Sequence, residues 1–361
     1  MMKLSIGFFA VFLFLWTFTA CKKETIIEVE RKTSWQLNEN YLYEERIQMN
    51  SYADGDALYT VGANSFSKIT VNKTDTSKLN IEFPNTPYSY QLQYKYPISA
   101  RVSIGLSLTN SQIGFLPIKW PGGENSATIS MKDQDPAFYH FDFPEYWQSE
   151  CIGINNLDQC LIPYQAKESG ASNALKFMAV NLKVSKNAQN GFDKVEASSV
   201  KRIKIDNNTG AIISLHTINN FFYITCANMT LRISPDLKVN IINKVKFYRI
   251  FSLNGAIYGF TESQLYKSTD NGLNWVSIAS NIANTFSKLN YYLIGGKICG
   301  AYNSQIFIFE FANNQMTTRE LANDGIGGNT ITSISEFNKK IFVTTLSGVF
   351  TKKSDKFLTY K

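Results

Sequence analysis

Few residues in this chain have the types and spacing that catalysis or metal binding requires. The sequence holds only two histidines, His140 and His216, and neither stands near a cysteine at zinc-site spacing. The Gly-x-Ser-x-Gly elbow and the glycine-rich phosphate loop are both absent. Asp54-Gly55-Asp56 and Asp133-Gln134-Asp135 do not continue into a calcium-loop spacing, which favours solvated turns. The sequence therefore predicts no cofactor and no metal.

The first residues are typical of a secretion signal. Lys3 supplies a positive charge, and Ile6 to Phe18 is almost wholly apolar but too short to span a bilayer. The segment ends in Phe18-Thr19-Ala20-Cys21, which resembles the lipobox of bacterial lipoproteins, with Phe18 where leucine is usual. That resemblance implies that residues 1–20 are a cleaved signal peptide and that Cys21 carries lipid, including palmitate. The alternative is an ordinary signal peptide with an incidental cysteine.

The residues after Cys21 carry charge. Lys22-Lys23-Glu24 resembles the surface-export signal of Bacteroidota lipoproteins, although that signal usually carries more acid. Residues 21–38 are then the lipidated cysteine and a tether, and the membrane is a partner through the lipid. Each buried methylene contributes roughly 0.8 kcal/mol, so two or three acyl chains anchor a protein firmly. We therefore expect a lipid-anchored protein of the cell outer membrane, displayed at the surface.

The positive charge of the chain is dispersed. The formal net charge is +7, and the densest basic stretch, Lys201 to Ile205, is interrupted by Ile203 and Ile205, as in a strand with one exposed face. This pattern does not resemble a nucleic-acid-binding arm. We expect no nucleic-acid partner.

Four cysteines remain beyond Cys21, in a compartment that permits disulfides. Cys151 and Cys160 straddle a predicted hairpin turn, Gly153 to Asp158, so they are candidates for a disulfide between antiparallel neighbours. Cys226 and Cys299 stand in apolar strands and are expected to be buried free thiols.

One pattern recurs in the last third of the chain. Residues 253–267 return as 294–308 and again as 337–351, with shifts of 41 and 43 residues. A repeat of about 40 to 50 residues that holds several short strands indicates a propeller blade. Phe, Tyr, Val, Ile and Thr are abundant, which favours strands. We predict an all-β fold, a β-propeller of four-stranded blades over residues 39–361.

The third strand of each blade is marked by an apolar step after a turn of Ser, Asn or Gln. The positions that fit are Phe66, Ile113, Leu161, Leu231, Leu265, Ile306 and Val349. They predict seven blades, with eight as the alternative. The gap of 70 residues between Leu161 and Leu231 predicts an insertion, with loop residues at 168–173 and 185–191. Ile331 to Tyr360 is expected to hold four strands, with Trp35 to Tyr43 as an extra strand at the ring closure.

Residues 268–275, Ser-Thr-Asp-Asn-Gly-Leu-Asn-Trp, resemble the Asp-box, S/T-x-D-x-G-x-x-W. Asp270 can accept hydrogen bonds from backbone N–H groups two residues on, and Gly272 permits a positive φ. Trp275 can return its ring to the blade core. The resemblance implies a structural turn between the third and fourth strands, formed by Ser268, Asp270, Gly272 and Trp275, away from the ligand face.

Asp-box propellers include sialidases and sortilin-like receptors, so the resemblance also implies a glycosidase alternative. Sialidase-like enzymes hold the substrate carboxylate with three arginines and use a tyrosine nucleophile. Arg-Ile occurs here four times, never followed by the proline of the sialidase signature. Nothing marks a triad among the seven arginines, Arg31, Arg46, Arg101, Arg202, Arg232, Arg249 and Arg319. We expect a chain that is not an enzyme.

A binding or scaffold module for protein or glycan ligands fits the sequence better. In a propeller, the turns between second and third strands share a face with the links between blades. That face is predicted to include Glu262, Tyr302 and Asn303, and it is polar with little charge. A further candidate is the aromatic segment 138–147, whose rings could stack on sugars. A buried blade strand is the favoured interpretation of that segment.

Overall fold

The computed structural model falls into two compact units, Met1–Thr33 and Ser34–Lys361. It describes residues 34–43, 46–63, 65–84, 97–99, 101–107, 111–119, 123–143, 150–167, 174–205, 209–242, 245–312 and 315–361. The predicted signal peptide, Cys21 and most of the tether lie outside these residues. The second unit begins at Ser34, earlier than the predicted start of the propeller at residue 39.

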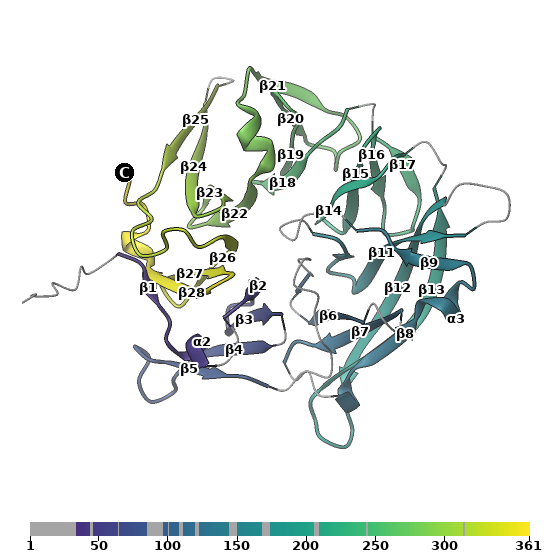
Figure 1. Ribbon diagram of the computed structural model, residues 1–361, viewed down its shortest axis with the longest axis horizontal. Helices are drawn as coiled ribbons and strands as arrows, with labels where there is room; N and C mark the ends of the chain where they lie inside the picture. Colours follow the sequence, from purple (N-terminus) through teal and green to yellow (C-terminus); the bar gives the residue numbers. More distant parts are fainter. Residues whose placement is uncertain are drawn as a thin grey trace, which may run out of the picture. The chain divides into compact units, whose positions relative to one another are not determined.

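Seven antiparallel sheets stand around a common centre in the second unit (Figure 1). The predicted seven-bladed β-propeller is confirmed. The first blade contains β2 (Gln48–Ala53), β3 (Ala57–Gly62), β4 (Phe66–Val71) and β5 (Leu79–Glu82). The second contains β6 (Val102–Ser107), β7 (Gln112–Pro117) and β8 (Ala127–Ser130). The third contains β9 (Phe138–Phe141), β10 (Gly153–Ile154), β11 (Gln159–Ala166), β12 (Ala174–Lys186) and β13 (Asp193–Lys204).

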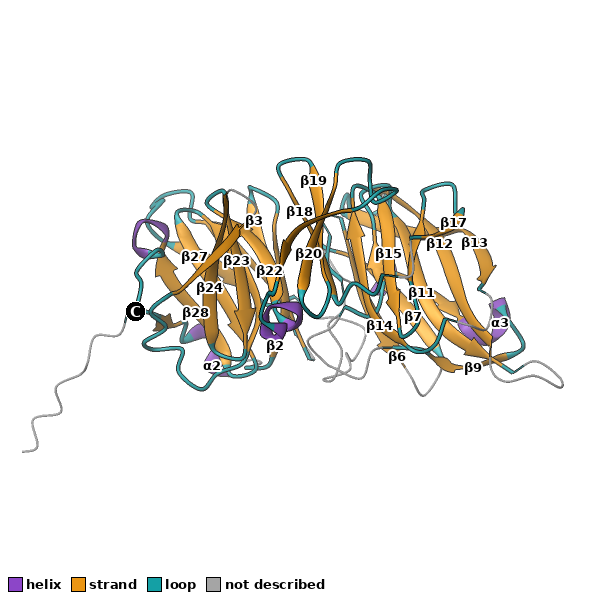
Figure 2. Cartoon of the chain, turned by 90° about the horizontal axis from the view of Figure 1, so that it is seen from above, coloured by secondary structure: helices purple, strands orange, loops and turns teal. Residues whose placement is uncertain are grey.

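The remaining four blades each hold four strands. The fourth contains β14 (Ile212–Ile218), β15 (Phe221–Cys226), β16 (Thr230–Ile233) and β17 (Val239–Ile241), and the fifth contains β18 (Arg249–Leu253), β19 (Ala256–Phe260), β20 (Gln264–Ser268) and β21 (Val276–Ser280). The sixth contains β22 (Asn290–Ile294), β23 (Lys297–Tyr302), β24 (Gln305–Ala312) and β25 (Gln315–Glu320). The seventh contains β26 (Ile331–Phe337), β27 (Lys340–Thr345), β28 (Gly348–Lys353) and β1 (Gln36–Leu37). In side view the strands run between two faces formed by turns and loops (Figure 2).

Apolar side chains fill the spaces between neighbouring blades. One cluster joins the fifth and sixth blades through Phe260 and Phe309, and another joins the seventh and first through Phe342 and Leu58. Each sheet is apolar on both faces, so it is stable only when neighbours cover both. The blades therefore fold as a ring and not as independent units.

Leu161 is the one anchor residue that lies on a different strand from the one predicted. It stands on the second strand, β11, because two short strands, β9 and β10, pair with the same edge of β11 and together fill the innermost position. The other anchors occupy third strands. For Ile113 this holds when the bridge between Ile98 and Ser103 is taken as the innermost position of the second blade, which makes β7 the third strand.

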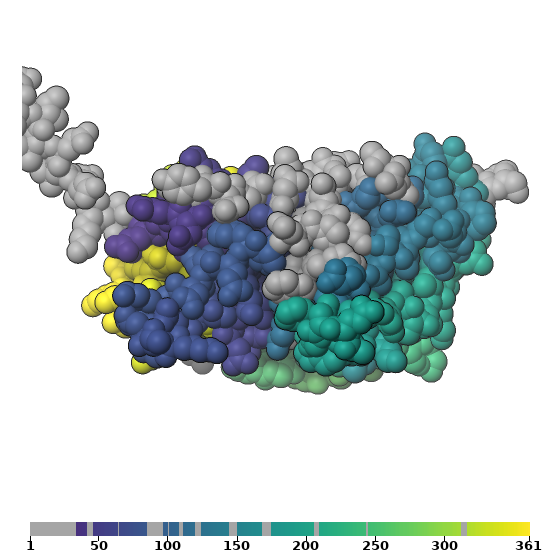
Figure 3. Space-filling model, turned by 90° about the horizontal axis from the view of Figure 1, so that it is seen from below, coloured from purple at the N-terminus to yellow at the C-terminus, as the bar shows by residue number. Residues whose placement is uncertain are grey.

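The third blade also departs from the repeat in its length. β12 and β13 have 13 and 12 residues, and this hairpin extends to the second blade, where Leu182 and Val195 join the same apolar cluster as Ile104. At its tip the Asn187 amide donates to Asn125 Oδ1 at 2.6 Å. In Figure 3 the hairpin, in teal, lies beside the blue surface of that blade. The gap of 70 residues thus reflects the second-strand position of Leu161 together with these longer strands. Residues 187–192 form the hairpin turn, residues 185 and 186 still belong to β12, and the predicted loop 168–173 lies outside the described residues.

The ring is closed by the start of the second unit. β1 pairs with β28, so Gln36 faces Thr351 and Leu37 faces Phe350, and β1 becomes the outermost strand of the last blade. The expectation that 331–360 would supply four strands is wrong, because this segment supplies three and the 3-10 turn Ser354–Lys356 follows. The extra strand predicted within Trp35 to Tyr43 is β1, followed by the short helix α2 (Asn40–Tyr43).

Trp35 fixes β1 in place. Its side chain is 1% exposed, its indole N–H donates to the Ala322 carbonyl at 3.2 Å, and its ring meets that of Phe357 edge-on at 6.2 Å. The Lys352 ammonium lies over the ring at 5.4 Å. One buried tryptophan thus joins the start of the propeller to its last two blades.

We predict that Trp35→Ala lowers the free energy of unfolding by about 3–5 kcal/mol, the usual cost of truncating a buried aromatic side chain. Chemical denaturation of the full chain would measure it. Leu37→Ala, on the same strand but 37% exposed, is the matched control and should cost much less. Equal losses from the two variants would contradict a specific role for Trp35 in closure.

Candidate functional site

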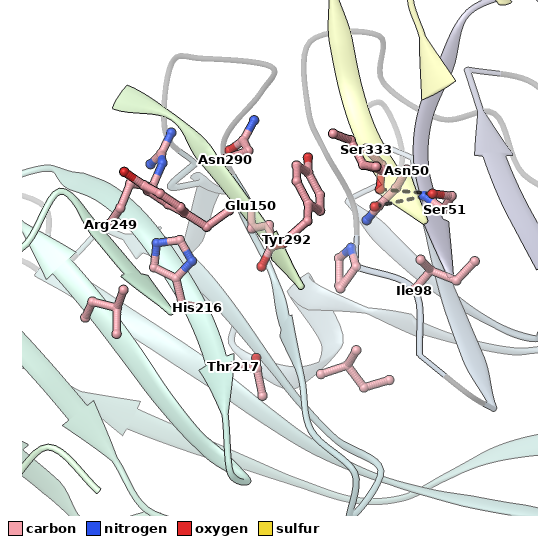
Figure 4. A pocket seen from close by; sticks show the side chains of 15 residues that line it. Asn50, Ser51, Ile98, Glu150, His216, Thr217, Arg249, Asn290, Tyr292 and Ser333 are labelled. Atoms are coloured by element: carbon pink, nitrogen blue, oxygen red, sulfur yellow. Dashed lines mark hydrogen bonds between the residues drawn. The ribbon is translucent and has the colours of Figure 1, made fainter. Parts of the chain in front are cut away.

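A cavity of about 300 Å³ lies at the centre of the ring. Side chains from the innermost position of every blade line it, and Figure 4 shows Arg249, His216, Glu150 and Tyr292 around the same space, with Asn50 and Ser51 across from them. A second space of about 270 Å³ shares Glu150, His216 and Tyr292 with it. A propeller concentrates residues from distant parts of the sequence at its axis in this way.

Arg249 is the first residue of β18 and is held by backbone carbonyls. Its Nε donates to Leu289 O at 3.0 Å and its Nη1 to Tyr248 O at 3.1 Å, which fixes the plane of the guanidinium. Desolvation lowers the pKa of Arg249, and the negative charge of Glu150 acts in the opposite direction. The group stays protonated because arginine begins from a pKa above 12.

Glu150 reaches the cavity through the interruption of the innermost strand in the third blade. β9 ends at Phe141 and β10 begins at Gly153, and both pair with β11. Glu150 precedes β10 and lines both spaces. This departure from the repeat adds a carboxylate to the centre of the ring.

The hydroxyls of the two cavity tyrosines, Tyr291 and Tyr292, donate hydrogen bonds to backbone carbonyls. Tyr291 donates to Phe286 O at 2.7 Å and Tyr292 to Thr332 O at 2.9 Å. Burial raises the pKa of Tyr291 well above its ordinary value, with Arg249 acting in the opposite direction. A tyrosine nucleophile needs a hydroxyl that can lose its proton. These two side chains are therefore suited to shaping the cavity and not to attacking a substrate.

The predicted ligand face lies at the end of the ring where the links between blades arrive. Ile331 N, where one link enters β26, donates to Asn303 O at 2.7 Å, and Ile282 N in another link donates to Ser263 O at 3.0 Å. Asn303 and Glu262 are exposed and Tyr302 is half-buried. Tyr248, next to Arg249, donates its hydroxyl to Glu262 at 2.8 Å. Glu262 therefore lies close to the end of the cavity that holds Arg249.

The turn from β20 to β21 contains the residues that resemble an Asp-box. Asp270 Oδ1 accepts from the backbone of Leu273 at 3.1 Å and of Asn274 at 2.9 Å. The Ser268 hydroxyl accepts from Gly272 N at 2.9 Å, and Gly272 has a φ of +76°. Hydrogen bonds from the backbone and then the side chain of Asn274 are the main causes that lower the pKa of Asp270 to about 2.

This turn also contacts the preceding blade. The Tyr223 hydroxyl and Arg232 Nη1 both donate to Asn271 O at 2.8 Å. The Trp275 ring lies 4.4 Å from that of Phe247, and its indole N–H donates to Gly272 O at 3.0 Å. The turn therefore adds polar contacts to the packing between the fourth and fifth blades.

The predicted disulfide is absent from the structure. Cys151 and Cys160 are not bonded to each other, because the hairpin register places Ile154, and not Cys151, opposite Cys160. Burial raises the pKa of both thiols. Cys226 and Cys299 are buried free thiols, as predicted.

The aromatic segment contributes mainly to the core. Phe138 and Phe141 are buried in the apolar cluster, whereas Tyr139 is exposed with the Lys167 ammonium 4.2 Å from its ring centre. Residues 144–149 lie outside the described residues.

Of the two aspartate pairs, one departs from the predicted solvated turn. Asp135 is buried, where it accepts from the Tyr164 hydroxyl at 2.8 Å and lies 3.4 Å from the Lys176 ammonium. Asp54 caps a turn by accepting from Ala57 N at 2.9 Å. The described ranges contain no cluster of three or more histidine, cysteine or acidic side chains that could hold a metal.

Sequence reasoning missed the cavity as a site. In the sequence, Arg249 is one of seven arginines and no motif distinguishes it. No motif marks Glu150, His216 or Asn290 as residues of a site. The innermost strand of each blade could have been located from the repeat in the later blades, where Arg249 and Asn290 each open that strand. Glu150 could not have been found in this way, because its segment breaks the repeat.

No family model matches the chain, and no curated protein does. Solved structures are similar to it at low identity. Porphyromonas gingivalis PorZ, described as a bacterial surface component of the type-IX secretion system, has 7% identity and a TM-score of 0.46 over 91% of this chain and 39% of its own. An extracellular domain from B. thetaiotaomicron has 10% identity and a TM-score of 0.48 over 89% of this chain and 39% of its own.

A functionally unknown protein from Desulfotomaculum acetoxidans has 11% identity and a TM-score of 0.47, with 84% of this chain and 95% of that one covered. The chain thus spans 39% of the length of the first two structures. Within the described ranges, no helix has the length and apolar character needed to cross a membrane.

We predict that Asp270→Ala lowers the free energy of unfolding by roughly 1–2 kcal/mol, because hydrogen bonds to a charged group contribute about 1.5–3 kcal/mol and solvent weakens them at a turn. Thr269→Ala, at an exposed position of the same turn, is the matched control.

The effect of Asp270 should also depend on pH. Its pKa of about 2 in the folded protein lies below the ordinary 3.8, so the carboxylate stabilises the fold above about pH 4 and less as pH falls towards 2. Thermal unfolding of the wild type and Asp270→Ala between pH 2 and 7 would measure this. A difference in Tm that stays constant across the range would contradict it.

Proposed function

We propose that this chain is a binding or scaffold propeller for protein or glycan ligands, held by lipid at the outer membrane. The observation that carries the proposal is the central cavity, to which every blade contributes and whose polar groups are held by backbone contacts. Rigid polar groups in a concave site are typical of ligand recognition. The cavity combines them with tyrosines whose hydroxyls are already occupied.

The surface around the cavity supports the same proposal. Glu262, Tyr302 and Asn303 belong to turns on the link face, and the Tyr248–Glu262 hydrogen bond adjoins Arg249. A larger ligand would contact these turns. We propose that the Asp-box-like turn acts by stabilising the packing of the fifth blade and takes no part in binding.

The arrangement argues against a sialidase-like glycosidase. A triad needs three guanidinium groups around one carboxylate. Among the arginines within the described ranges, only Arg249 lines the cavity, while Arg101 pairs with Asp158 and Arg232 contacts Asn271. A screen of glycosidase substrates should therefore give no turnover, and turnover abolished by Arg249→Lys would overturn the proposal.

Binding would be measured with the full chain in detergent on protein and glycan arrays. We predict that Glu262→Lys weakens binding of a captured ligand at least tenfold, because it reverses a charge on the link face. Glu39→Lys, at an exposed position before α2, is the matched control and should leave affinity unchanged. Equal effects of the two changes would exclude the link face as the contact surface.

We propose that Cys21 carries the lipid anchor. Cys21→Ala should abolish labelling with palmitate and release the protein from the membrane fraction, because the acyl chains supply the membrane affinity. Cys299→Ala, which removes a buried thiol, is the control and should keep the label. Label that persists in Cys21→Ala would contradict the anchor.

A further inference from the structure

Arg249 has hydrogen-bonding capacity that the part of the chain described by the structure does not use. A guanidinium carries five N–H donors. Two of those of Arg249 bind the carbonyls of Leu289 and Tyr248. Within the described residues no acidic side chain forms an ion pair with it. The remaining donors belong to a rigid fork at the edge of the cavity, which is the geometry that binds carboxylates in two-point contacts.

Asn290 adds a second donor beside Arg249. It opens β22, directly after Leu289, whose carbonyl receives the Arg249 Nε. The Asn290 amide nitrogen is buried and has no hydrogen-bond partner among the described residues, and the same holds for the Thr217 hydroxyl. Both residues line the cavity. An unpartnered buried donor destabilises the fold, so its presence beside unused guanidinium donors points to an acceptor supplied by a ligand.

The cavity also carries a negative side. Glu150 lines it, and its charge acts on Arg249. A phosphate, with close to two negative charges, would face repulsion from Glu150, and a simple cation would face repulsion from Arg249. A ligand with one carboxylate and one ammonium matches both charges. The ring of Tyr292 adds a face that attracts a cation.

The size of the cavity limits the ligand. About 300 Å³ lies at the lower end of the range for small-molecule sites. The wall across from Arg249 is neutral, since Asn50 Oδ1 accepts from Ser51 N at 2.9 Å and the Ser51 hydroxyl bonds to that of Ser333 at 3.0 Å. That wall can contact a small uncharged side group.

We propose that the central cavity binds a free α-amino acid, with the carboxylate on Arg249 and Asn290 and the ammonium towards Glu150. This inference rests on the proposed binding function and names the ligand class of its central site. The link face would then contact a separate, larger ligand.

The test uses the full chain in detergent and the twenty common L-amino acids as probes, screened by thermal shift and measured by calorimetry. At least one should bind. Its decarboxylated amine and its deaminated acid should each bind at least tenfold more weakly, because each lacks one of the two charges. A deaminated acid that binds as tightly as the amino acid, or a panel with no binder, would overturn the proposal.

Variants separate binding from folding. Arg249→Gln should weaken binding roughly a hundredfold, whereas Arg46→Gln, at an exposed arginine outside the cavity, should not change it. Glu150→Gln should reduce the preference for the amino acid over its deaminated acid. Unchanged affinity in Arg249→Gln would contradict the carboxylate site.

Asn290→Ala keeps the test informative even if Arg249→Gln fails to fold. Because the Asn290 amide nitrogen has no partner, its removal should leave Tm unchanged or raise it while weakening amino-acid binding at least fivefold. A fall in Tm with unchanged affinity would show a structural role and overturn its part in the site. Array ligands are scored on the same variants, so binding at the link face without any amino-acid binding would refute only this inference.

Discussion

The packing of one blade against the next is the constraint on which this structure depends. Each sheet presents apolar side chains on both faces, and six apolar clusters lie between neighbouring blades of the unit from Ser34 to Lys361. A ring has one seam at which the ends of the chain must meet. Here β1 joins β28, and Tyr41, after β1, packs with Leu58 and Phe342 of the first and last blades. The seam is therefore secured by residues that precede the first complete blade.

The same constraint leaves the axis free for polar residues. Side chains on the faces of a sheet must pack against neighbours, but those at the innermost edge meet only the centre of the ring. His216, Arg249 and Asn290 occupy innermost strands without disturbing the apolar clusters. The third blade adds Glu150 by breaking its innermost strand, and the long β12–β13 hairpin extends the third blade to cover the second. Departures from the repeat thus supply both a charged group and a structural brace.

The sequence predicts the fold in the parts where each blade repeats faithfully. In the last three blades the turns between the first and second strands place Asn254, Gly295 and Asn338 at positive φ, and these positions follow the same shifts of 41 and 43 residues as the sequence repeat. Leu161 was assigned to a third strand because the interruption between β9 and β10 has no counterpart in other blades. β1 was hard to recognise because two residues carry almost no pattern. The predicted Cys151–Cys160 disulfide is wrong because strand register depends on the type of turn. The sequence of the turn does not reveal that Ile154, and not Cys151, lies opposite Cys160.

The site was less predictable than the fold for a different reason. Its residues come from innermost strands separated by tens of residues, and a single strand does not reveal which of its side chains faces the axis. Arg249 is informative only once its two carbonyl contacts and the unused donors beside Asn290 are known. Natural proteins often keep unfavourable groups where function requires them. Among the described residues, the buried Asn290 amide donor that has no partner, next to a guanidinium with further donors, fits this pattern. We propose that a bound acceptor would satisfy this donor, which would couple binding in the cavity to the stability of the ring.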